Sequence, residues 1–254
     1  MTPPFILLTS NIRYANPADG AHAWEHRRAV LSTILKGHGP QLIATQEGRE
    51  PQLRDLEGLL GDYRLLDRHR RWIPERMYPC LFLRQGDATA DGSGDIWLST
   101  TPEVAGSSSF GSAFPRLCTW ARLRHRGKLL FVVNCHLDHK SGAAREAQSK
   151  VLTQELVKIL RPVDHLILMG DFNEGPAGNV RRHIVAALPQ LRDPWTLPEE
   201  TTHHPFAGDY QDGARIDWIL VDQRLHVTEM NIIKEQLHGT WPSDHYPVKV
   251  SIEV

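Results

Sequence analysis

The strongest constraint on the fold is a set of strand-like segments that each lead into a polar side chain. Residues 166–169 are consecutive apolar residues, which is typical of a strand covered on both faces, and residues 5–8 and 41–45 predict further strands. A lone carboxylate is very costly to bury unless it is paired or binds a cation. We therefore expect these strand ends to meet at one rim of a sheet and to form a cation site. The polar groups at or near predicted strand ends are Asn11, Glu47, His136, Asp171, Asn173, Asp217, Asp244 and His245.

The other periodicities complete an α/β pattern. Apolar residues recur at helical spacing over residues 24–36, 51–60, 143–160 and 179–187. Apolar or alternating runs predict strands over residues 80–84, 96–99, 118–124, 128–137, 216–221, 227–233 and 248–254. Residues 68–94 are rich in arginine, glycine and aspartate, and we predict a surface excursion with one strand there.

Length and composition are those of an ordinary globular protein. The 254 residues contain no linker-like stretch, so we expect a single domain over residues 1–254. The 30 acidic and 29 basic residues nearly cancel, which provides no strong overall field toward nucleic acid or an anionic membrane. The three cysteines fit no disulfide framework, and there is no signal-like start or long apolar run. We therefore expect a soluble, cytoplasmic monomer without membrane insertion.

The residue types at the predicted rim indicate the kind of metal. Carboxylate oxygens suit a hard cation such as Mg²⁺ or Mn²⁺, whereas zinc normally recruits several His or Cys ligands. The segment His136-Leu137-Asp138-His139 lacks a preceding His-x-His, and the sequence contains no His-Glu-x-x-His. It also contains neither the Gly-x-Ser-x-Gly of serine hydrolases nor a Gly-x-x-x-x-Gly-Lys-Ser/Thr phosphate loop. Hydrolysis assisted by Mg²⁺ or Mn²⁺ is the favoured chemistry.

A phosphate ester is a natural substrate for such a site, because its cleavage needs charge neutralisation, a positioned water and a stabilised leaving oxygen. Glu47 is the candidate metal ligand, and Asp171 is the candidate acceptor of a proton from the water. Asn173 lies two residues after Asp171, so on a regular strand both would face the same side.

His245 needs an orienting carboxylate. Its chain neighbour Asp244 is unsuited, because adjacent residues of an extended chain point to opposite faces. Asp217 is the expected partner, and Asp244 is then left to face the metal.

Six short segments occur in order between residues 10 and 248. They are Ser10-Asn11-Ile12-Arg13, Gln46-Glu47, Asn134-Cys135-His136-Leu137, Gly170-Asp171-Phe172-Asn173, Arg215-Ile216-Asp217-Trp218-Ile219 and Ser243-Asp244-His245-Tyr246-Pro247-Val248. Together they resemble the motifs of the endonuclease/exonuclease/phosphatase superfamily, which includes pancreatic deoxyribonuclease, abasic-site endonucleases and neutral sphingomyelinases. The resemblance implies a four-layer α/β/β/α sandwich of two packed mixed β-sheets flanked by helices, with Mg²⁺ or Mn²⁺ as cofactor.

The resemblance also implies roles for single residues. Arg13 stands where abasic-site endonucleases have an Asp, which argues against a second metal site. The segment Pro115-Arg116 to Trp120-Ala121-Arg122 is similar to bacterial hydrolases of this superfamily. The further implied roles are Asn11 beside the metal, Asn173 and His136 on the phosphate, and Arg116, Asn11 and Arg13 in contact with the substrate.

Ordinary structural explanations remain for each motif taken alone. Asp171 and Asn173 could be turn residues after a strand, Glu47 a solvated strand end and His136 a core histidine. The histidines expected at the surface are His139, His203, His204 and His238, of which His203 or His204 could line the cleft.

Two further features have two interpretations each. Asp138 could have a site role or form a salt bridge with Arg145. The cluster from Arg68 to Arg76 could be a solvated face or, with Trp72, a cleft wall that attracts an anionic substrate or stacks on a base.

The sequence thus favours a metal-dependent phosphoesterase. Among such enzymes we favour a phosphodiesterase acting on a small or lipid-like phosphoester, because the chain has no broad basic stripe; a nuclease acting on DNA or RNA is the alternative. A catalytically silent binding module would lack at least one core ligand, and none is missing. A zinc-dependent hydrolase of a non-phosphate bond would instead retain zinc through purification.

Overall fold

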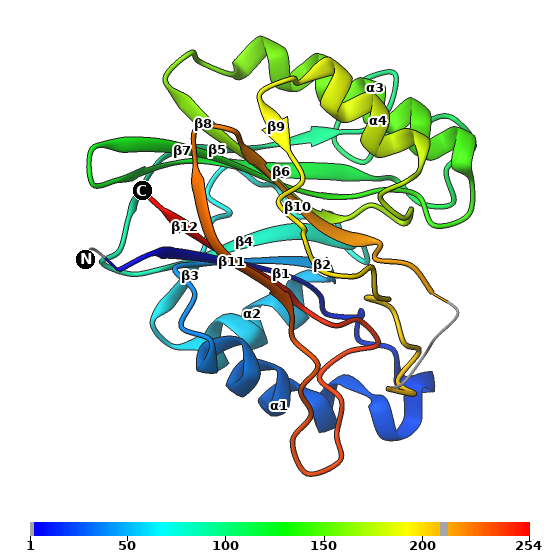
Figure 1. The fold of residues 1–254 in the computed structure, drawn as a ribbon. Coiled ribbons are helices and arrows are strands. Elements are labelled where there is room, and N and C mark those ends of the chain that lie inside the picture. The colour runs from blue at the N-terminus through cyan, green and yellow to red at the C-terminus, as the bar shows by residue number, and fades with distance from the viewer. Residues whose placement is uncertain (1–2, 209–212) are drawn as a thin grey trace.

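Two β-sheets packed face to face form the centre of the protein, as seen in a computed structural model that describes residues 3–208 and 213–254. Each sheet has six strands. Helices cover the outer face of each sheet, so that the layers follow one another as helix, sheet, sheet and helix (Figure 1). The predicted four-layer sandwich of two mixed sheets is confirmed.

The first sheet brings together the first and last strands of the described chain. Its strands, in spatial order, are β11 (His226–Ile232), β12 (Val248–Glu253), β1 (Phe5–Asn11), β2 (Leu42–Gly48), β4 (Tyr78–Arg84) and β3 (Tyr63–Leu65). Strands β1 and β2 run parallel, and the other neighbours are antiparallel. Because Asn11 is in register with Gln46, the parallel pair delivers Asn11 and Glu47 to the same edge.

The second sheet has a similar design. Its strands, in spatial order, are β5 (Thr89–Trp97), β6 (Leu117–His125), β7 (Lys128–His136), β8 (Asp164–Asp171), β10 (Asp217–Asp222) and β9 (Leu191–Arg192). Strands β7 and β8 are parallel, with His136 opposite Asp171, and Asp217 at the start of β10 is also opposite Asp171. Three predicted site residues therefore form one row across neighbouring strands.

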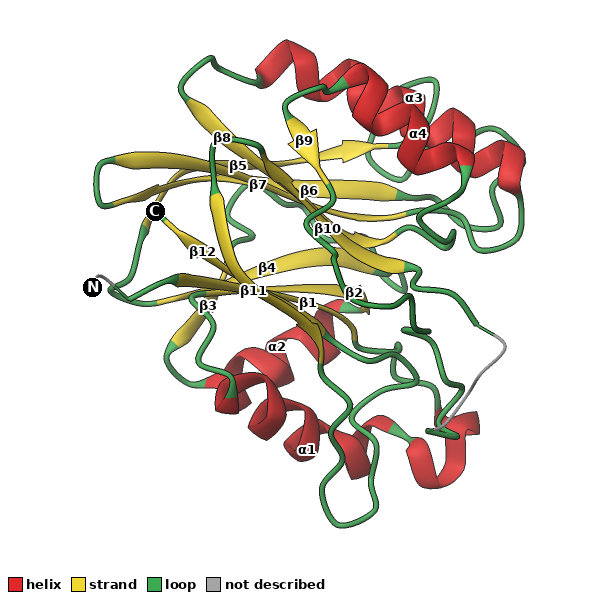
Figure 2. Cartoon of the chain, viewed as in Figure 1, coloured by secondary structure: helices red, strands yellow, loops and turns green. Residues whose placement is uncertain are grey.

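Helices shield the two outer faces (Figure 2). The helices are α1 (Trp24–Gly37) and α2 (Glu50–Leu60) on the first sheet, α3 (Gly142–Ile159) and α4 (Asn179–Ala187) on the second, and the short 3₁₀-helix η1 (Pro17–His22) before α1. The four predicted helices are confirmed to within about two residues at their ends. No helix in the described ranges is long and apolar enough to cross a bilayer.

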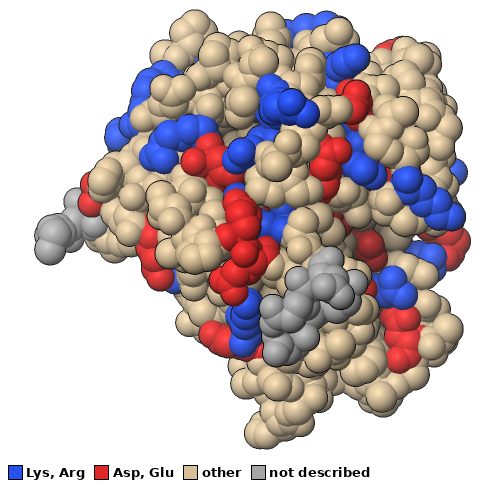
Figure 3. All heavy atoms as spheres, turned by 45° about the vertical axis from the view of Figure 1, so that its right-hand side comes forward, with Lys and Arg blue, Asp and Glu red and all other residues tan. Residues whose placement is uncertain are grey.

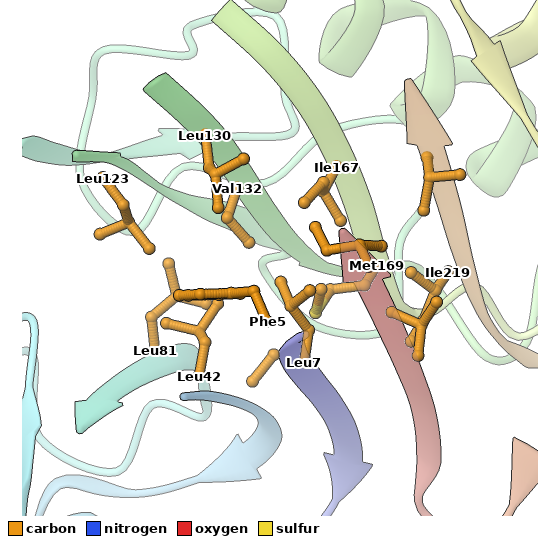
Figure 4. Close-up of a cluster of buried hydrophobic side chains, with 14 of the residues drawn as sticks. Phe5, Leu7, Leu42, Leu81, Leu123, Leu130, Val132, Ile167, Met169 and Ile219 are labelled. Carbon is orange, nitrogen blue, oxygen red and sulfur yellow. The ribbon is translucent and has the colours of Figure 1, made fainter. Parts of the chain in front are cut away.

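Apolar side chains fill the space between the sheets (Figure 4). Those labelled in the figure are Phe5, Leu7, Leu42 and Leu81 from the first sheet, and Leu123, Leu130, Val132, Ile167, Met169 and Ile219 from the second. Their burial supplies the main driving force for packing one sheet on the other, but it is not directional.

Strand β5 corrects the prediction for residues 68–94. A Gly/Asp-rich loop was expected before residue 96, yet the chain from Thr89 to Trp97 pairs with β6. Glycine is needed there because the Trp120 side chain lies across the strand: a Cβ on Gly94 would sit 2.7 Å from the indole Nε1. Cross-strand packing therefore overrides the loop-like composition. Strand β3 is also absent from the sequence prediction, as three residues are too short to leave a pattern.

Gly170 allows β7 and β8 to approach each other just before Asp171. Its φ is 141°, and a Cβ there would lie 2.0 Å from the carbonyl oxygen of Cys135. Backbone cannot move aside as a flexible side chain can. The glycine of the Gly170-Asp171 segment is thus required by the close contact of two strands.

We predict that Gly170→Ala destabilises the protein strongly. Relief of the clash with Cys135 should cost about 2 to 3 kcal/mol, which corresponds to a fall of roughly 5 to 10 °C in thermal midpoint. Gly58→Ala is the matched control, because a Cβ on Gly58 in α2 meets nothing within 4 Å and should stabilise the helix by up to about 1 kcal/mol. Equal midpoints for the two variants would contradict the prediction.

Candidate functional site

Side chains from both sheets meet at one rim of the sandwich. In Figure 1 this is the rim at which β1 and β2 end, on the right. The Asn11 amide at the end of β1 donates through Nδ2 to Oδ2 of Asp171, at the end of β8, over 2.9 Å. The same nitrogen lies 3.3 Å from Oε1 of Glu47, near the end of β2. One amide therefore joins carboxylates from two sheets, and the predicted Asn11, Glu47 and Asp171 form one cluster.

Three residues of this rim have left-handed backbone, namely Arg13 (φ 51°), Glu47 (φ 68°) and Asn173 (φ 53°). Such conformations are uncommon outside glycine and persist only where surrounding contacts impose them. The N–H of Arg13 donates to Asn11 Oδ1, and the N–H of Asn173 donates to Asp171 Oδ1, both at 2.9 Å. The strand alternation expected for Asp171 and Asn173 is therefore wrong, and the chain also leaves the strand conformation at Arg13, although tight turns keep both Arg13 and Asn173 at the site.

Asp171 is buried, with only 1% of its surface exposed. Burial raises the pKa of its carboxyl to about 7, and the Asp217 carboxylate adds to this rise. The His245 charge and the hydrogen bonds from Asn11 and Asn173 oppose it. A carboxyl with a pKa near neutrality is suited to accept a proton from water.

The predicted pair of His245 and Asp217 is present. His245 Nδ1 donates to Asp217 Oδ2 over 2.8 Å. Burial alone would lower the pKa of His245, but Asp217, Asp171 and Asp244 outweigh it and raise the pKa to about 10. The ring is therefore an imidazolium at neutral pH, with Nε2 as its second donor.

His136 is held as a neutral ring. Arg116 Nη1 donates to His136 Nδ1 over 2.9 Å, which leaves the proton on Nε2, and Nε2 lies 3.4 Å from Asp171 Oδ2. Burial and the charge of Arg116 hold the pKa of His136 well below its ordinary value. Within the described chain, no carboxylate forms an ion pair with Arg116, although its side chain is almost fully buried. That unpaired cation faces the cleft.

The rim opens into a cleft of about 680 Å³. Predicted site residues that line it are Arg13, Glu47, Arg116, His136, Asp171, Asn173, Asp244 and His245. Asn11 and Asp217 stand behind them and hold Asp171 and His245 by hydrogen bonds. All the predicted site residues are thus together in space, while their individual roles stay predictions.

The residues offer several oxygen ligands for a metal. Among the residues that the structure describes, two groups bring ligand atoms within 4.8 Å of one another, namely Asp171, Asp217 and His245, and His203, Asp244 and His245. Glu47 belongs to neither group but lines the same cleft. Because His245 is charged and already donates to Asp217, carboxylates are the better donors here, and they suit a hard divalent cation.

A second cavity, of about 880 Å³, is larger but lacks such a site. Three cations line it, and each is already paired with a carboxylate. The pairs are Arg181 with Asp193, Arg215 with Glu199, and Lys234 with Glu200. The smaller cleft is therefore the better candidate despite its size.

Sequence reasoning missed one histidine of the cleft. His139 was expected at the surface, but it lines the cleft, where its Nδ1 accepts from Arg116 Nη2 at 3.2 Å. The spacing of His136 and His139 was a usable signal. Of the two histidines that were alternatives for lining the cleft, His203 is the one that does so, and it forms a β-bridge with His245. The surface prediction is also wrong for His204, which is fully buried.

The arginine cluster divides into separate roles. Arg70 is buried against Asp95, and Trp72 packs edge-on against Tyr78. Of the arginines in residues 68–76, Arg76 alone lines the cleft. The predicted cleft wall therefore holds for Arg76 and not for Trp72.

Asp138 does not form the suggested salt bridge with Arg145. Arg145 instead donates to the backbone carbonyl of Asp138, over 3.1 Å. The Asp138 carboxylate accepts hydrogen bonds from two loops, one of which carries His139. Its role is to fix loops that border the cleft.

Comparison with known proteins identifies a family and solved structures that share this fold. A sequence model described as the Endonuclease/Exonuclease/phosphatase family matches residues 8–245. The chain is similar to the mannosyl-6-phosphatase Bt3783 of Bacteroides thetaiotaomicron, with 26% identity, a TM-score of 0.88 and coverage of 98% of this chain and 100% of that chain. An endonuclease/exonuclease/phosphatase from Bacteroides vulgatus has 26% identity and a TM-score of 0.89, with both chains fully covered. D. rerio TDP2, complexed with a single-strand DNA product, shares the fold at 16% identity, a TM-score of 0.78 and 99% coverage of each chain. Comparison with curated proteins gives no match.

We predict that the metal-free protein loses stability as His245 loses its proton. The folded pKa, about 10, exceeds the unfolded value of about 6.5, so the stabilisation is complete below about pH 6.5 and is lost as the pH rises through about 10. In EDTA-treated protein, the free energy of unfolding by urea should exceed that of His245→Gln by more at pH 6 than at pH 9. The exposed His26 gives the control, His26→Gln, which should follow wild type at both values. A difference in free energy of unfolding between wild type and His245→Gln that is larger at pH 9 than at pH 6 would contradict the raised pKa of His245.

Proposed function

Because the chain belongs to the endonuclease/exonuclease/phosphatase family, we propose that it is a divalent-metal-dependent hydrolase of a small phosphate ester. The observation that carries this proposal is the Asn11 amide, which joins Glu47 and Asp171 across the two sheets at the floor of the cleft. It brings an expected metal ligand beside an expected proton acceptor. Binding modules need no such convergence of acids.

The donor set fits a hard cation. Glu47 and Asp244 line the cleft with carboxylate oxygens, and Asn11 is hydrogen-bonded to Glu47. Mg²⁺ and Mn²⁺ favour such oxygen ligands, and we propose Glu47 as the principal one, with Asn11 and Asp244 beside it. When bound, the cation would neutralise charge on the phosphoryl oxygens and on the leaving group.

The side chains of the cleft divide the remaining work. Asp171 takes the proton of the attacking water, for which a pKa of about 7 is well placed. Asn173 contacts the water or a phosphoryl oxygen. The Asn173 Nδ2 donates a hydrogen bond to the Leu137 carbonyl, which fixes the orientation of the amide. His245, charged and oriented by Asp217, donates from Nε2 to the phosphoryl group.

Arg116 supplies fixed positive charge. Its guanidinium is buried, has no carboxylate ion pair within the described chain and is oriented by His136 and His139. A buried cation without a counter-ion is costly unless an anion completes the site. We propose that the substrate phosphoryl group is that anion, with the Nε2 proton of His136 beside it.

The kind of ester is the finer part of the proposal. The sequence favoured a phosphodiester, whereas the similarity to a mannosyl-6-phosphatase favours a sugar phosphomonoester. We propose a small phosphate ester, with a sugar phosphate as the first candidate. Figure 3 shows acidic and basic side chains interspersed on one face, rather than a stripe of one sign, which disfavours a long nucleic acid.

Turnover should appear with Mg²⁺ or Mn²⁺ and vanish with EDTA. The substrate panel comprises nitrophenyl phosphate, bis-nitrophenyl phosphate, mannose 6-phosphate, plasmid DNA and RNA, and we expect the small esters to be hydrolysed fastest. Asp171→Asn should lower kcat by about a hundredfold or more, because it removes the proton acceptor. Circular-dichroism melting verifies that the variant is folded.

Asp62→Asn is the control, since Asp62 is exposed and lies outside the sequence segments that carry the site residues. It should keep wild-type activity. Full activity of Asp171→Asn would remove Asp171 from the mechanism. Turnover that survives EDTA and tracks bound zinc would favour zinc chemistry instead.

Arg116→Lys tests the phosphate contact. Lysine keeps the charge but loses the forked donors that hold the phosphoryl group and both histidines. We expect kcat/KM to fall by about tenfold to a hundredfold, the effect of losing one or two charge-assisted hydrogen bonds. Arg28 is an exposed arginine on α1, and the control variant Arg28→Lys should leave kcat/KM unchanged. Wild-type kcat/KM in Arg116→Lys would contradict the contact.

A further inference from the structure

Phe114 presents an exposed aromatic ring at the mouth of the cleft. It lies in the loop between β5 and β6, is 45% exposed and lines the cleft. Its ring stacks on that of His139, with centroids 5.7 Å apart. The guanidinium carbon of Arg116 lies 5.8 Å from the Phe114 centroid. An apolar surface so close to the expected phosphate would gain free energy by covering this ring.

A buried carboxylate holds this ring in place. Asp138 has no exposed surface, and its two oxygens accept hydrogen bonds of 2.7 to 3.0 Å from the loops on both sides of the stacked pair. The donors are Ser112 Oγ and the backbone N–H groups of Ala113, Lys140 and Ser141. Gln148 Nε2 also donates to Ser112 Oγ, over 2.9 Å. Such rigid support for an exposed ring is what a preorganised binding surface requires.

Resting on the proposed function, we propose that Phe114 and His139 form a platform for a sugar ring in the alcohol part of the substrate. With the phosphoryl group at Arg116, the ring of the same ester lies over Phe114. Asp138 is then a positioning residue, since it acts on the substrate only through the two loops.

The surroundings favour a sugar over a nucleobase. A sugar ring has a face of C–H groups that can pack on Phe114, and hydroxyls that need polar partners. Other residues that line the cleft provide these, namely Arg76 and the ion pair of Arg49 with Glu75. Tyr14 also lines the cleft, but the guanidinium groups of Arg13 and Arg49 cover its ring at 4.7 and 5.1 Å. A base could therefore stack on one side only.

The test compares substrates with and without a ring. We would measure kcat and KM for mannose 6-phosphate, glycerol 1-phosphate and adenosine 5′-monophosphate, with Mg²⁺ present. Phe114→Ala should raise KM for mannose 6-phosphate by about tenfold relative to glycerol 1-phosphate, and Phe114→Trp should retain the wild-type ratio. Asp138→Asn should shift KM in the same direction more than kcat.

Phe110→Ala is the matched control. Phe110 is an exposed ring of the same loop, but it lines a different cavity. Its removal should leave the substrate ratio as in wild type.

Each failure has a separate signature. If Phe114→Ala changes KM equally for the substrates with and without a ring, the platform is overturned although wild-type turnover persists. A greater effect on adenosine 5′-monophosphate than on mannose 6-phosphate would overturn the sugar assignment in favour of a base. Wild-type protein that hydrolyses none of these esters would instead contradict the proposed function.

Discussion

The hydrogen bond from Asn11 to Asp171 is the contact on which the site depends, because it crosses between the sheets. Burial of the apolar core favours packing of the two sheets, but this effect is not directional and would permit one sheet to slide over the other. The hydrogen bond of 2.9 Å between Asn11 and Asp171 is directional and opposes such sliding. Glu47 shares the same amide, so the relative position of the two carboxylates is set by one side chain.

A second polar link supports the first. Gln46 Nε2 donates to Asn134 Oδ1 over 2.7 Å, and the Asn134 amide donates to the Thr45 carbonyl over 2.8 Å. These groups are fully buried between β2 and β7, where an unsatisfied amide would cost about 1 to 3 kcal/mol. Because Gln46 precedes Glu47 and Asn134 lies two residues before His136, the link fixes both strands next to the site.

The sequence predicts well what local rules decide. The polar strand ends and the helices follow from periodicity, and alternation along an extended chain excludes Asp244 as the partner of His245, which is hydrogen-bonded to the expected Asp217. It fails where distant contacts decide. Strand β5 depends on Trp120 lying against Gly94, and His139 faces the cleft beside Arg116, whose position comes from another strand. The left-handed turn at Asn173 depends on the bond that it makes to Asp171, so no strand period could foretell it.

The site also separates the charge states of neighbouring groups. Burial alone would favour neutral forms of all of them. Asp217 keeps His245 charged, whereas Arg116 helps to keep His136 neutral, and Asp171 has a pKa of about 7 between these extremes. A charged donor, a neutral donor and a proton acceptor thus coexist in one small volume. Arg116 has no carboxylate partner within the described chain, so its charge is left for an anion that arrives from solution. The same cluster that makes the rim costly to bury therefore carries the charges that the proposed phosphate ester requires.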